Sequence, residues 1–191
     1  ATFAVTFFLS LYLQYIRGYS PQAAGLILAV QPMVMALFAS LSGTLADRAD
    51  PGRIASFGMA LSVLALLLLA MTGIETSLAY LVVCVIVLGL GLAFFASPNT
   101  TAIMGSVERR FYGVASGTLG TMRLVGQMLS MGIATIILAL YIGKVAITPD
   151  TYHQFLSGMR TAFLIFAVLC GAGIGFSLIR GTVKQAERPE N

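Results

Sequence analysis

The stretch GTLADRADPGR, from Gly43 to Arg53, places four charged residues within eleven positions. The whole chain of 191 residues has only 11 basic and 7 acidic residues, and long uncharged runs lie on both sides of this stretch. Two glycines and a proline accompany the charges. This combination is typical of a turn between two long apolar segments, so the class of fold depends on what those segments are.

The composition indicates a membrane protein. Hydrophobic residues make up 58% of the chain and charged residues 9%, whereas about a quarter of the residues of a soluble domain are charged. A helix needs about 20 mostly apolar residues to cross a bilayer. We therefore expect an all-α membrane protein with six transmembrane helices and no soluble domain. The six segments are about 1–16, 22–46, 54–73, 78–105, 111–141 and 159–179.

The first segment is short, and it begins without a methionine or a basic flank. A secretory signal peptide would have a basic start before its short apolar core. We therefore expect that this sequence begins inside a longer protein.

Basic residues are unevenly distributed between the loops that six helices place on alternating sides. Seven of them lie in 47–53, 106–110 and the tail 180–191, and three lie in 17–21, 74–77 and 142–160. Loops rich in lysine and arginine stay in the cytoplasm. This pattern predicts a cell-membrane protein with both ends of the chain in the cytoplasm. It also accounts for the net charge of +4 without a nucleic-acid partner.

Two loop signals predict helix starts. Ser20 followed by Pro21 suits an N-cap and a first helical position. The sequence Thr148-Pro149-Asp150 gives the same signal within the longest external loop, where we expect a short helix on the membrane surface.

Polar residues are not equally distributed among the six segments. Segments 54–73 and 159–179 are apolar nearly all round, as expected for helices that face lipid. The first segment instead has polar residues at four-residue spacing, which keeps them on one face. These residues are Thr2, Thr6, Ser10 and Gln14, with Tyr12 nearby. In the second segment Gln31 precedes Pro32, and the fourth ends in Ser97-Pro98-Asn99.

The fifth segment carries a stripe of small and polar residues at helical spacing: Gly113, Ser116, Gly117, Gly120, Arg123, Gln127, Ser130 and Ala134. Gly113, Gly117 and Gly120 predict close packing against another helix. Arg123 is the only charged residue well inside a predicted span, where a charge costs at least ~2.5 kcal/mol on insertion scales. Two interpretations stay open. Arg123 is either a structural arginine that reaches helix-end carbonyls or the interface, or it lines a polar cavity together with Gln127.

Three stretches resemble the major facilitator superfamily of transporters. Gly43-Thr-Leu-Ala-Asp47-Arg48, followed by Gly52-Arg53, resembles the family's signature loop G-x-L-a-D-r-x-G-r, which joins the second and third helices of a six-helix half. Residues 11–32 and 97–127 are similar to the fourteen-helix drug/proton antiporter branch. The loop of this chain is two residues longer than the motif between Arg48 and Gly52.

The resemblance implies that the chain is the C-terminal six-helix half of a carrier and that it contains inverted three-helix repeats. It also implies that the first, second, fourth and fifth helices line a cavity between two halves, and these are the helices with polar residues here. The candidate cavity residues are Tyr12, Gln14, Gln31, Asn99, Arg123 and Gln127.

The candidate gating loop consists of Gly43, Asp47, Arg48 and Arg53. We expect Gly43 to let a neighbouring helix pack closely, and Asp47 to lie near a helix N-terminus, which favours a carboxylate by roughly 0.3–1 kcal/mol. Both arginines can pair with Asp47 or Asp50. By resemblance, such contacts hold the cytoplasmic gate in one state and break in the other.

No carboxylate or histidine lies in the middle of a predicted span, and a proton relay through a membrane usually needs one. We therefore predict a secondary transporter half with its coupling residues in the missing N-terminal half. By alternating access it would export small lipophilic or amphipathic compounds, in contact with lipid, substrate and the other half. The alternative is a non-transporting or half-size membrane module that pairs with a second copy of itself.

An enzyme is not predicted. The P-loop, HExxH and CxxC motifs are absent. Asp150, His153 and Ser157 lie in one loop, whereas members of a catalytic triad converge from separate parts of a fold. Cys84 and Cys170 fall in apolar segments and are expected to be small buried side chains. No metal, cofactor or catalytic residue is predicted.

Overall fold

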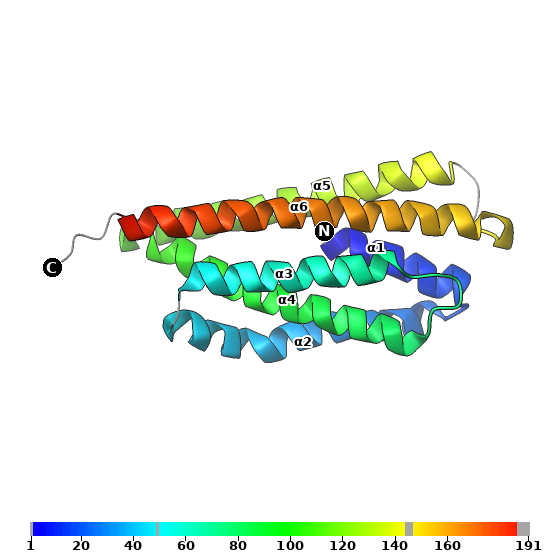
Figure 1. Cartoon of the computed structure of the whole chain (residues 1–191), viewed down its shortest axis with the longest axis horizontal. Helices are drawn as coiled ribbons and strands as arrows, with labels where there is room; N and C mark the ends of the chain where they lie inside the picture. The colour runs from blue at the N-terminus through cyan, green and yellow to red at the C-terminus, as the bar shows by residue number, and fades with distance from the viewer. Residues whose placement is uncertain (1, 49, 144–146, 187–191) are drawn as a thin grey trace.

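The structure, a computed structural model, describes residues 2–48, 50–143 and 147–186, without the side chains of residues 47, 48, 51 and 176–186. All regular elements in this part of the chain are helical. They are α1 (Thr2–Leu11), the π-helical turn η1 (Tyr12–Ile16), α2 (Pro21–Arg48), α3 (Pro51–Ala70), α4 (Leu78–Gly105), the 3₁₀ turn η2 (Arg109–Phe111), α5 (Tyr112–Tyr141), the 3₁₀ turn η3 (Pro149–Thr151) and α6 (Tyr152–Ala186). The helices run along the long axis of one elongated bundle (Figure 1). The predicted fold class, an all-α membrane bundle, is confirmed.

Five helices of the described chain are long and apolar enough to cross a membrane: α2, α3, α4, α5 and α6. The first helix, with its π-helical turn, covers only Thr2–Ile16. At 1.5 Å per residue it is about 22 Å long, whereas the apolar core of a bilayer is about 30 Å thick. Each of the six predicted segments thus overlaps a helix of the structure, but the first one is shorter than a complete span.

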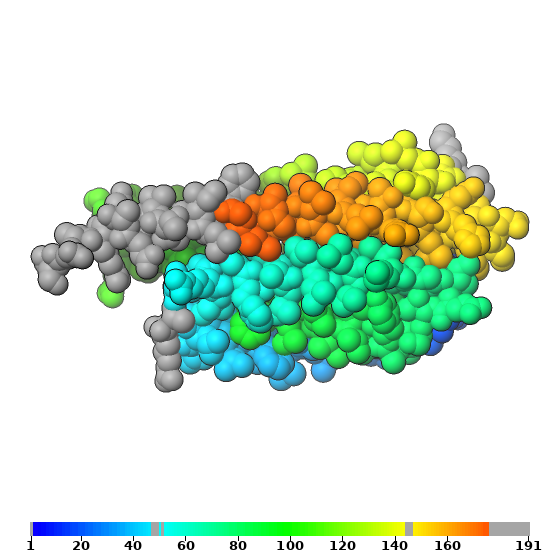
Figure 2. Space-filling model, viewed as in Figure 1, coloured from blue at the N-terminus to red at the C-terminus, as the bar shows by residue number. Residues whose placement is uncertain are grey.

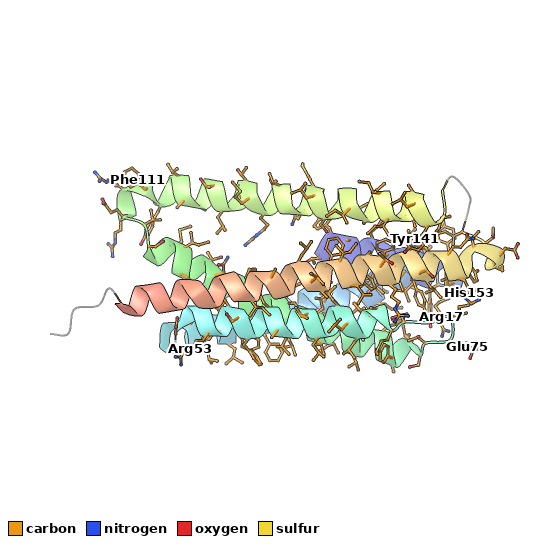
Figure 3. The ribbon with its side chains drawn as sticks, turned by 45° about the horizontal axis from the view of Figure 1, so that its top comes forward. Arg17, Arg53, Glu75, Phe111, Tyr141 and His153 are labelled. Atoms are coloured by element: carbon orange, nitrogen blue, oxygen red, sulfur yellow. The ribbon has the colours of Figure 1, made fainter. Side chains whose placement is uncertain are left out.

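The connections between helices alternate between two ends of the bundle. We call one the Gly73 end, with η1, the turn 71–77 and η3, and the other the Asp50 end, with the α2–α3 turn and η2. Figure 3 shows Arg17, Glu75, Tyr141 and His153 at the Gly73 end, and Arg53 and Phe111 at the Asp50 end.

Helix α4 lies at the centre of the packing, between α3 and α2. Its backbone meets that of α3 where Gly91 faces Gly58: a Cβ atom added to Gly58 would lie 2.6 Å from the carbonyl oxygen of Gly91. A Cβ atom added to Gly89 would lie 2.8 Å from the carbonyl oxygen of Gln31 in α2. Small residues permit such close approach between membrane helices. Two glycines therefore hold α4 against both of its neighbours.

Ser62 extends the small face of α3 by one turn. Its hydroxyl donates to the carbonyl oxygen of Gly58 at 3.0 Å, and its Oγ would lie 2.5 Å from a Cβ atom added to Gly91. Gly58 and Ser62 thus form a small-xxx-small pair, the pattern that promotes helix association in membranes. The sequence analysis did not single out this pair, although its four-residue spacing is visible in the sequence.

Helix α1 is held by aromatic packing. The fully buried ring of Phe8 lies 6.1 Å from that of Phe155 and 6.0 Å from that of Phe163, both in α6. Aromatic pairs at such distances add about 0.5–1.5 kcal/mol to the gain from burial. The short first helix is therefore part of the core of the bundle.

Two predictions of helix starts have different outcomes. The Ser20 hydroxyl accepts the N–H of Ala23 at 3.2 Å and Pro21 is the first residue of α2, which confirms that signal. The predicted surface helix at Thr148 is instead the 3₁₀ turn η3, with a capping box formed by Thr148 and Thr151, and it leads directly into α6. Helix α6 begins at Tyr152, well before the predicted residue 159. The predicted start comes from hydropathy. Because the first turns of α6 contain polar residues, their hydropathy is low, and the predicted start therefore lies too far along the chain.

Helix α3 does not lie only on the outside, as predicted for a lipid-facing helix. It packs between α4 and α6, and Figure 2 shows α6 directly against α3. Half of the most apolar stretch of α3 is buried inside the bundle, whereas the corresponding share is 17% in α2 and in α5. It keeps one exposed apolar stripe that suits lipid, formed by Phe57, Leu64, Leu67 and Met71.

We predict that Gly58→Ala lowers the stability of the bundle. The new methyl group would meet backbone atoms of α4 at 2.5 Å, so the two helices must separate, and such overpacking costs about 1–3 kcal/mol. The matched control is Gly171→Ala in α6, because no described atom lies within 4 Å of its new methyl group; it should stabilise α6 by about 0.5–1 kcal/mol. Thermal unfolding in detergent measures both. Equal unfolding temperatures for the two variants would contradict the α3–α4 contact.

Candidate functional site

The turn between α2 and α3 is built around Asp50. Its carboxylate caps α3 by accepting the N–H of Gly52 at 3.0 Å, and Pro51 occupies the first turn of that helix. Arg53 lies with its Nε 3.9 Å from Oδ2 of Asp50, and both side chains are exposed. The expected pairing of Arg53 with an aspartate of this loop is confirmed. Exposed pairs of this kind contribute about 0–1 kcal/mol.

The loop is longer than the family motif between Arg48 and Gly52, and two of the residues there have a structural role. Asp50 and Pro51 together form an N-cap and first position, a combination that favours a helix start. The side chains of Asp47 and Arg48 lie outside the described residues; their backbone belongs to the last turn of α2. Their predicted contacts therefore stay predictions.

Gly43 in α2 faces α4 at an ordinary van der Waals distance, so its predicted role in close helix packing stays a prediction. A Cβ atom added to Gly43 would lie 3.4 Å from Oγ of Ser97. Ser97 precedes Pro98, which is buried inside α4, and Asn99 follows it, half-buried. The signature loop and the end of the fourth segment, which are distant in sequence, therefore meet near the Asp50 end.

The first helix presents the predicted polar face. The amide of Gln14 donates to the hydroxyl of Ser10 at 2.8 Å, and the hydroxyl of Thr6 donates to the carbonyl oxygen of Thr2 at 3.1 Å. Gln14 is half-buried. Its polar group is thus at the surface of the bundle, where a cavity between two halves would lie.

Tyr12 does not line a cavity, which corrects the prediction. Its side chain is fully buried, and its hydroxyl donates to the carbonyl oxygen of Gly73 at 2.7 Å. The physical reason is its position around the helix axis. Tyr12, in η1, continues the buried face that α1 forms with Ala4, Val5, Phe8 and Leu9. It fastens the first helix to the α3–α4 turn.

Gln31 lies at the crossing of α2 and α4, where its carbonyl oxygen faces Gly89. The residue is only 7% exposed. It therefore belongs to the packing between two helices, with little surface left for a substrate.

Helix α5 is the most open part of the candidate site. No described residue comes within 4 Å of a Cβ atom added to Gly113, Gly117 or Gly120, so these glycines pack against no helix in the described part of the chain, and their predicted helix packing stays a prediction. The stripe lies on the half of α5 that is away from α6; the two helices come together toward Tyr141 (Figure 3). There a hydrogen bond of 2.9 Å joins the hydroxyls of Tyr141 and Thr161.

Arg123 is exposed on this open half and makes no hydrogen bond or ion pair with any residue that the structure describes. It lies about 17 Å along α5 from Tyr112, well inside the span. Gln127, one turn further, is half-buried, and Ser130 and Ala134 are buried where α5 meets the bundle. No contact within the described chain therefore matches the interpretation in which Arg123 hydrogen-bonds the carbonyls at a helix end.

The candidate cavity residues do not form one cluster in this chain. Gln14, Gln31, Asn99, Arg123 and Gln127 are all described, and no hydrogen bond or ion pair joins any two of them. Gln14 lies in η1, Gln31 in α2, Asn99 in α4, and Arg123 and Gln127 in α5. All of them except Gln31 are exposed or half-exposed. Such an arrangement can form a polar pathway only against a second surface.

A comparison with protein families matches the whole chain, residues 1–191, to the Major Facilitator Superfamily. Among similar proteins, the riboflavin transporter RibZ of Clostridioides difficile (strain 630) is 29% identical over 162 residues, which cover 85% of this chain and 34% of that protein. The tetracenomycin C resistance and export protein of Streptomyces glaucescens is 28% identical over 148 residues, 78% of this chain and 27% of that protein.

A tetracycline resistance determinant of Streptomyces rimosus is 32% identical over 150 residues, which cover 76% of this chain and 42% of that protein. In these relatives the matched region is about a third of the whole length. The chain is therefore similar to one part of each of these proteins.

We predict that Tyr12→Phe lowers stability by about 1 kcal/mol, since it removes a buried hydrogen bond of 2.7 Å and leaves the carbonyl oxygen of Gly73 with only the longer bond of 3.4 Å from the N–H of Thr76. Tyr15→Phe is the matched control, because the ring of Tyr15 is exposed and its hydroxyl makes no hydrogen bond with a described residue. Thermal unfolding in detergent measures both. A loss of substrate affinity in Tyr12→Phe with unchanged stability would restore Tyr12 to the cavity.

Proposed function

The chain belongs to the Major Facilitator Superfamily, and on that premise we propose that it is the C-terminal six-helix half of a secondary transporter. We propose that this transporter exports small lipophilic or amphipathic compounds by alternating access. Members of the family are transporters rather than enzymes, and the long apolar helices agree with an integral membrane protein. The finer proposal depends on the open face of α5.

One observation carries the proposal: a charged residue lies exposed and unpaired in the middle of a membrane helix. Burying such a group in lipid costs at least ~2.5 kcal/mol on insertion scales, so intramembrane arginines face protein or water. The described chain supplies no partner for Arg123. A second six-helix unit placed against α5 would cover the glycine stripe and enclose Arg123 in a polar space.

The length of the relatives supports the same arrangement. The chain matches about a third of each of them, so their remaining length provides room for a second unit. A carrier with two such units alternates by moving one against the other around a central site. The exposed small residues of α5 would then form a sliding contact rather than a fixed one.

The substrate class rests on two supports. Resistance or export functions appear in the names of several relatives, including the tetracenomycin C exporter and a multidrug resistance protein of Mycobacterium tuberculosis. The open side of the chain also combines amides, such as Gln14 and Gln127, with exposed apolar side chains of α5, such as Met122 and Met128. A surface of this kind suits amphipathic compounds, because it offers hydrogen bonds beside a large apolar area.

Coupling is assigned to the other unit. In the described part of the chain no carboxylate or histidine lies in the middle of a span, and His153 is at the Gly73 end (Figure 3). The proton pathway of an antiporter would therefore use residues outside this chain. By the charge pattern, we place the Asp50 end in the cytoplasm and the protein in the cell membrane.

The alternative of a half-size module that pairs with its own copy is tested by the size of the natural polypeptide. A blot of the source cells against the C-terminal tail separates the two proposals. A band well above the 20.2 kDa of this chain supports the half of a larger carrier, and a band near this mass supports the homodimer.

We predict that Arg123→Gln lowers substrate efflux at least tenfold without a change in the unfolding temperature. The substitution removes a charge that has no partner in the described chain, so the bundle itself loses no contact. Efflux is measured in cells that express equal amounts of each protein, with Arg109→Gln, an equal charge change at η2, as control. An unchanged efflux rate would favour the structural interpretation of Arg123.

We predict that Asp47→Asn impairs transport and leaves membrane insertion intact, because the gating contact needs the carboxylate charge. The matched control is Asp150→Asn, the same chemical change at the Gly73 end, where the side chain is exposed. Asp150 lies outside the candidate gating loop, so this variant should transport at the wild-type rate. Wild-type transport by Asp47→Asn would contradict the gating role.

A further inference from the structure

A pocket of about 410 Å³ lies at the Gly73 end, away from the helices of the candidate transport face. One wall is the end of α3 with the turn that follows it, including Met71, Thr72 and Gly73. The other wall is the beginning of α6, including His153, Ser157 and Arg160. Neither wall belongs to α1, α2, α4 or α5, so the pocket is separate from the proposed pathway.

The three polar residues of α6 form one face of the helix, since positions i, i+4 and i+7 lie above one another. None of these side chains makes a hydrogen bond or ion pair with any residue that the structure describes. The described lining contains no acidic residue. His153, Ser157 and Arg160 are thus free to bind a group from outside the chain.

The wall that carries Thr72 is held in place by its neighbours. The carbonyl oxygen of Gly73 accepts the Tyr12 hydroxyl at 2.7 Å, and the N–H of Gly73 donates to Oγ1 of Thr76 at 2.7 Å. Arg17 donates to the carbonyl oxygen of Ile74 at 3.5 Å. A wall fixed in this way needs little ordering when a ligand binds, which favours affinity.

The charge of the pocket favours an anion. The C-terminus of α3 carries a partial charge of about −0.5, which opposes an anion, but two of its last carbonyls are already hydrogen-bonded. That of Leu68 accepts the Tyr80 hydroxyl at 2.8 Å, and that of Leu69 accepts the N–H of Thr72 at 3.1 Å. Arg160 contributes a full positive charge, and the start of α6, at His153, contributes a partial positive one.

We propose that this pocket binds the phosphate group of an anionic phosphate ester. The planar guanidinium of Arg160 matches two phosphate oxygens, and the hydroxyl of Ser157 and a ring N–H of His153 can bind the others. The neighbouring Leu156 and the exposed Met71 suit an apolar substituent of the ester. The ester is either the headgroup of an anionic phospholipid, since the pocket lies at an end of the membrane helices, or a soluble phosphate.

The test uses the natural protein that contains this sequence, purified in neutral detergent, and isothermal titration calorimetry. One arm titrates dihexanoyl phosphatidylglycerol, with dihexanoyl phosphatidylcholine as the zwitterionic control, and the other titrates inorganic phosphate. Arg160→Gln should weaken binding at least tenfold, which is about 1.4 kcal/mol. Arg160→Lys should weaken it less, because it keeps the charge. Arg109→Gln, an equal charge change at the Asp50 end, should leave binding unchanged.

Ser157→Ala separates a binding role from a structural one. The side chain of Ser157 is exposed, and its hydroxyl bonds to no described residue. The unfolding temperature should therefore stay the same, while affinity falls about threefold. Binding of phosphatidylglycerol alone assigns the site to a lipid headgroup, and equal binding of inorganic phosphate assigns it to a soluble anion. Absence of binding in both arms, or binding that Arg160→Gln does not weaken, overturns the proposal.

Discussion

The contact between the backbones of α3 and α4 at Gly58 and Gly91 determines the arrangement of the other helices. In a lipid environment apolar side chains gain little by leaving the lipid, so helices associate through close packing and hydrogen bonds. A single Cβ atom at Gly58 would already be too near the backbone of α4. Gly89, two residues from Gly91, brings α2 to another side of the same helix. Because α6 also packs on α3, the glycine-rich segment of α4 sets the relative positions of α2, α3, α4 and α6.

The two ends of the bundle are fastened to different degrees. At the Gly73 end, hydroxyls of tyrosines join separate elements: Tyr12 bonds to the α3–α4 turn, Tyr152 donates to the carbonyl oxygen of Tyr15 at 2.6 Å, and Tyr141 bonds to Thr161. Fully buried residues of α5 begin at Ser130, and its first half is exposed except at Ala115 and Leu119, which are half-buried. A helix held at one end can change its angle with few broken contacts. This unequal fastening suits a half that must move against another unit.

Two kinds of polar site lie on different parts of the fold. The open face around Arg123 has no counter-surface in the described chain, and under the proposed function a second unit would supply one. The pocket at the Gly73 end has both of its walls within the described chain, so the proposed anion site would need no second unit. The difference follows from the packing, because α3 and α6 are in contact along much of their length (Figure 2), whereas α5 leaves the bundle toward the Asp50 end.

The sequence by itself determined the fold class, the approximate location of each helix, the cap at Ser20 and the family, because hydropathy, turn residues and the signature loop are local properties. It also placed Gln14 and Arg123 on polar faces, since spacing along a helix sets which residues share a face. Only the tertiary structure decided that Tyr12 lies in the core and that Gly113, Gly117 and Gly120 meet no helix in the described part of the chain. The sequence does not distinguish a glycine that another backbone faces, such as Gly58, from a glycine that faces open space. Which of these holds depends on helix crossings, and these are set by contacts between residues far apart in the chain.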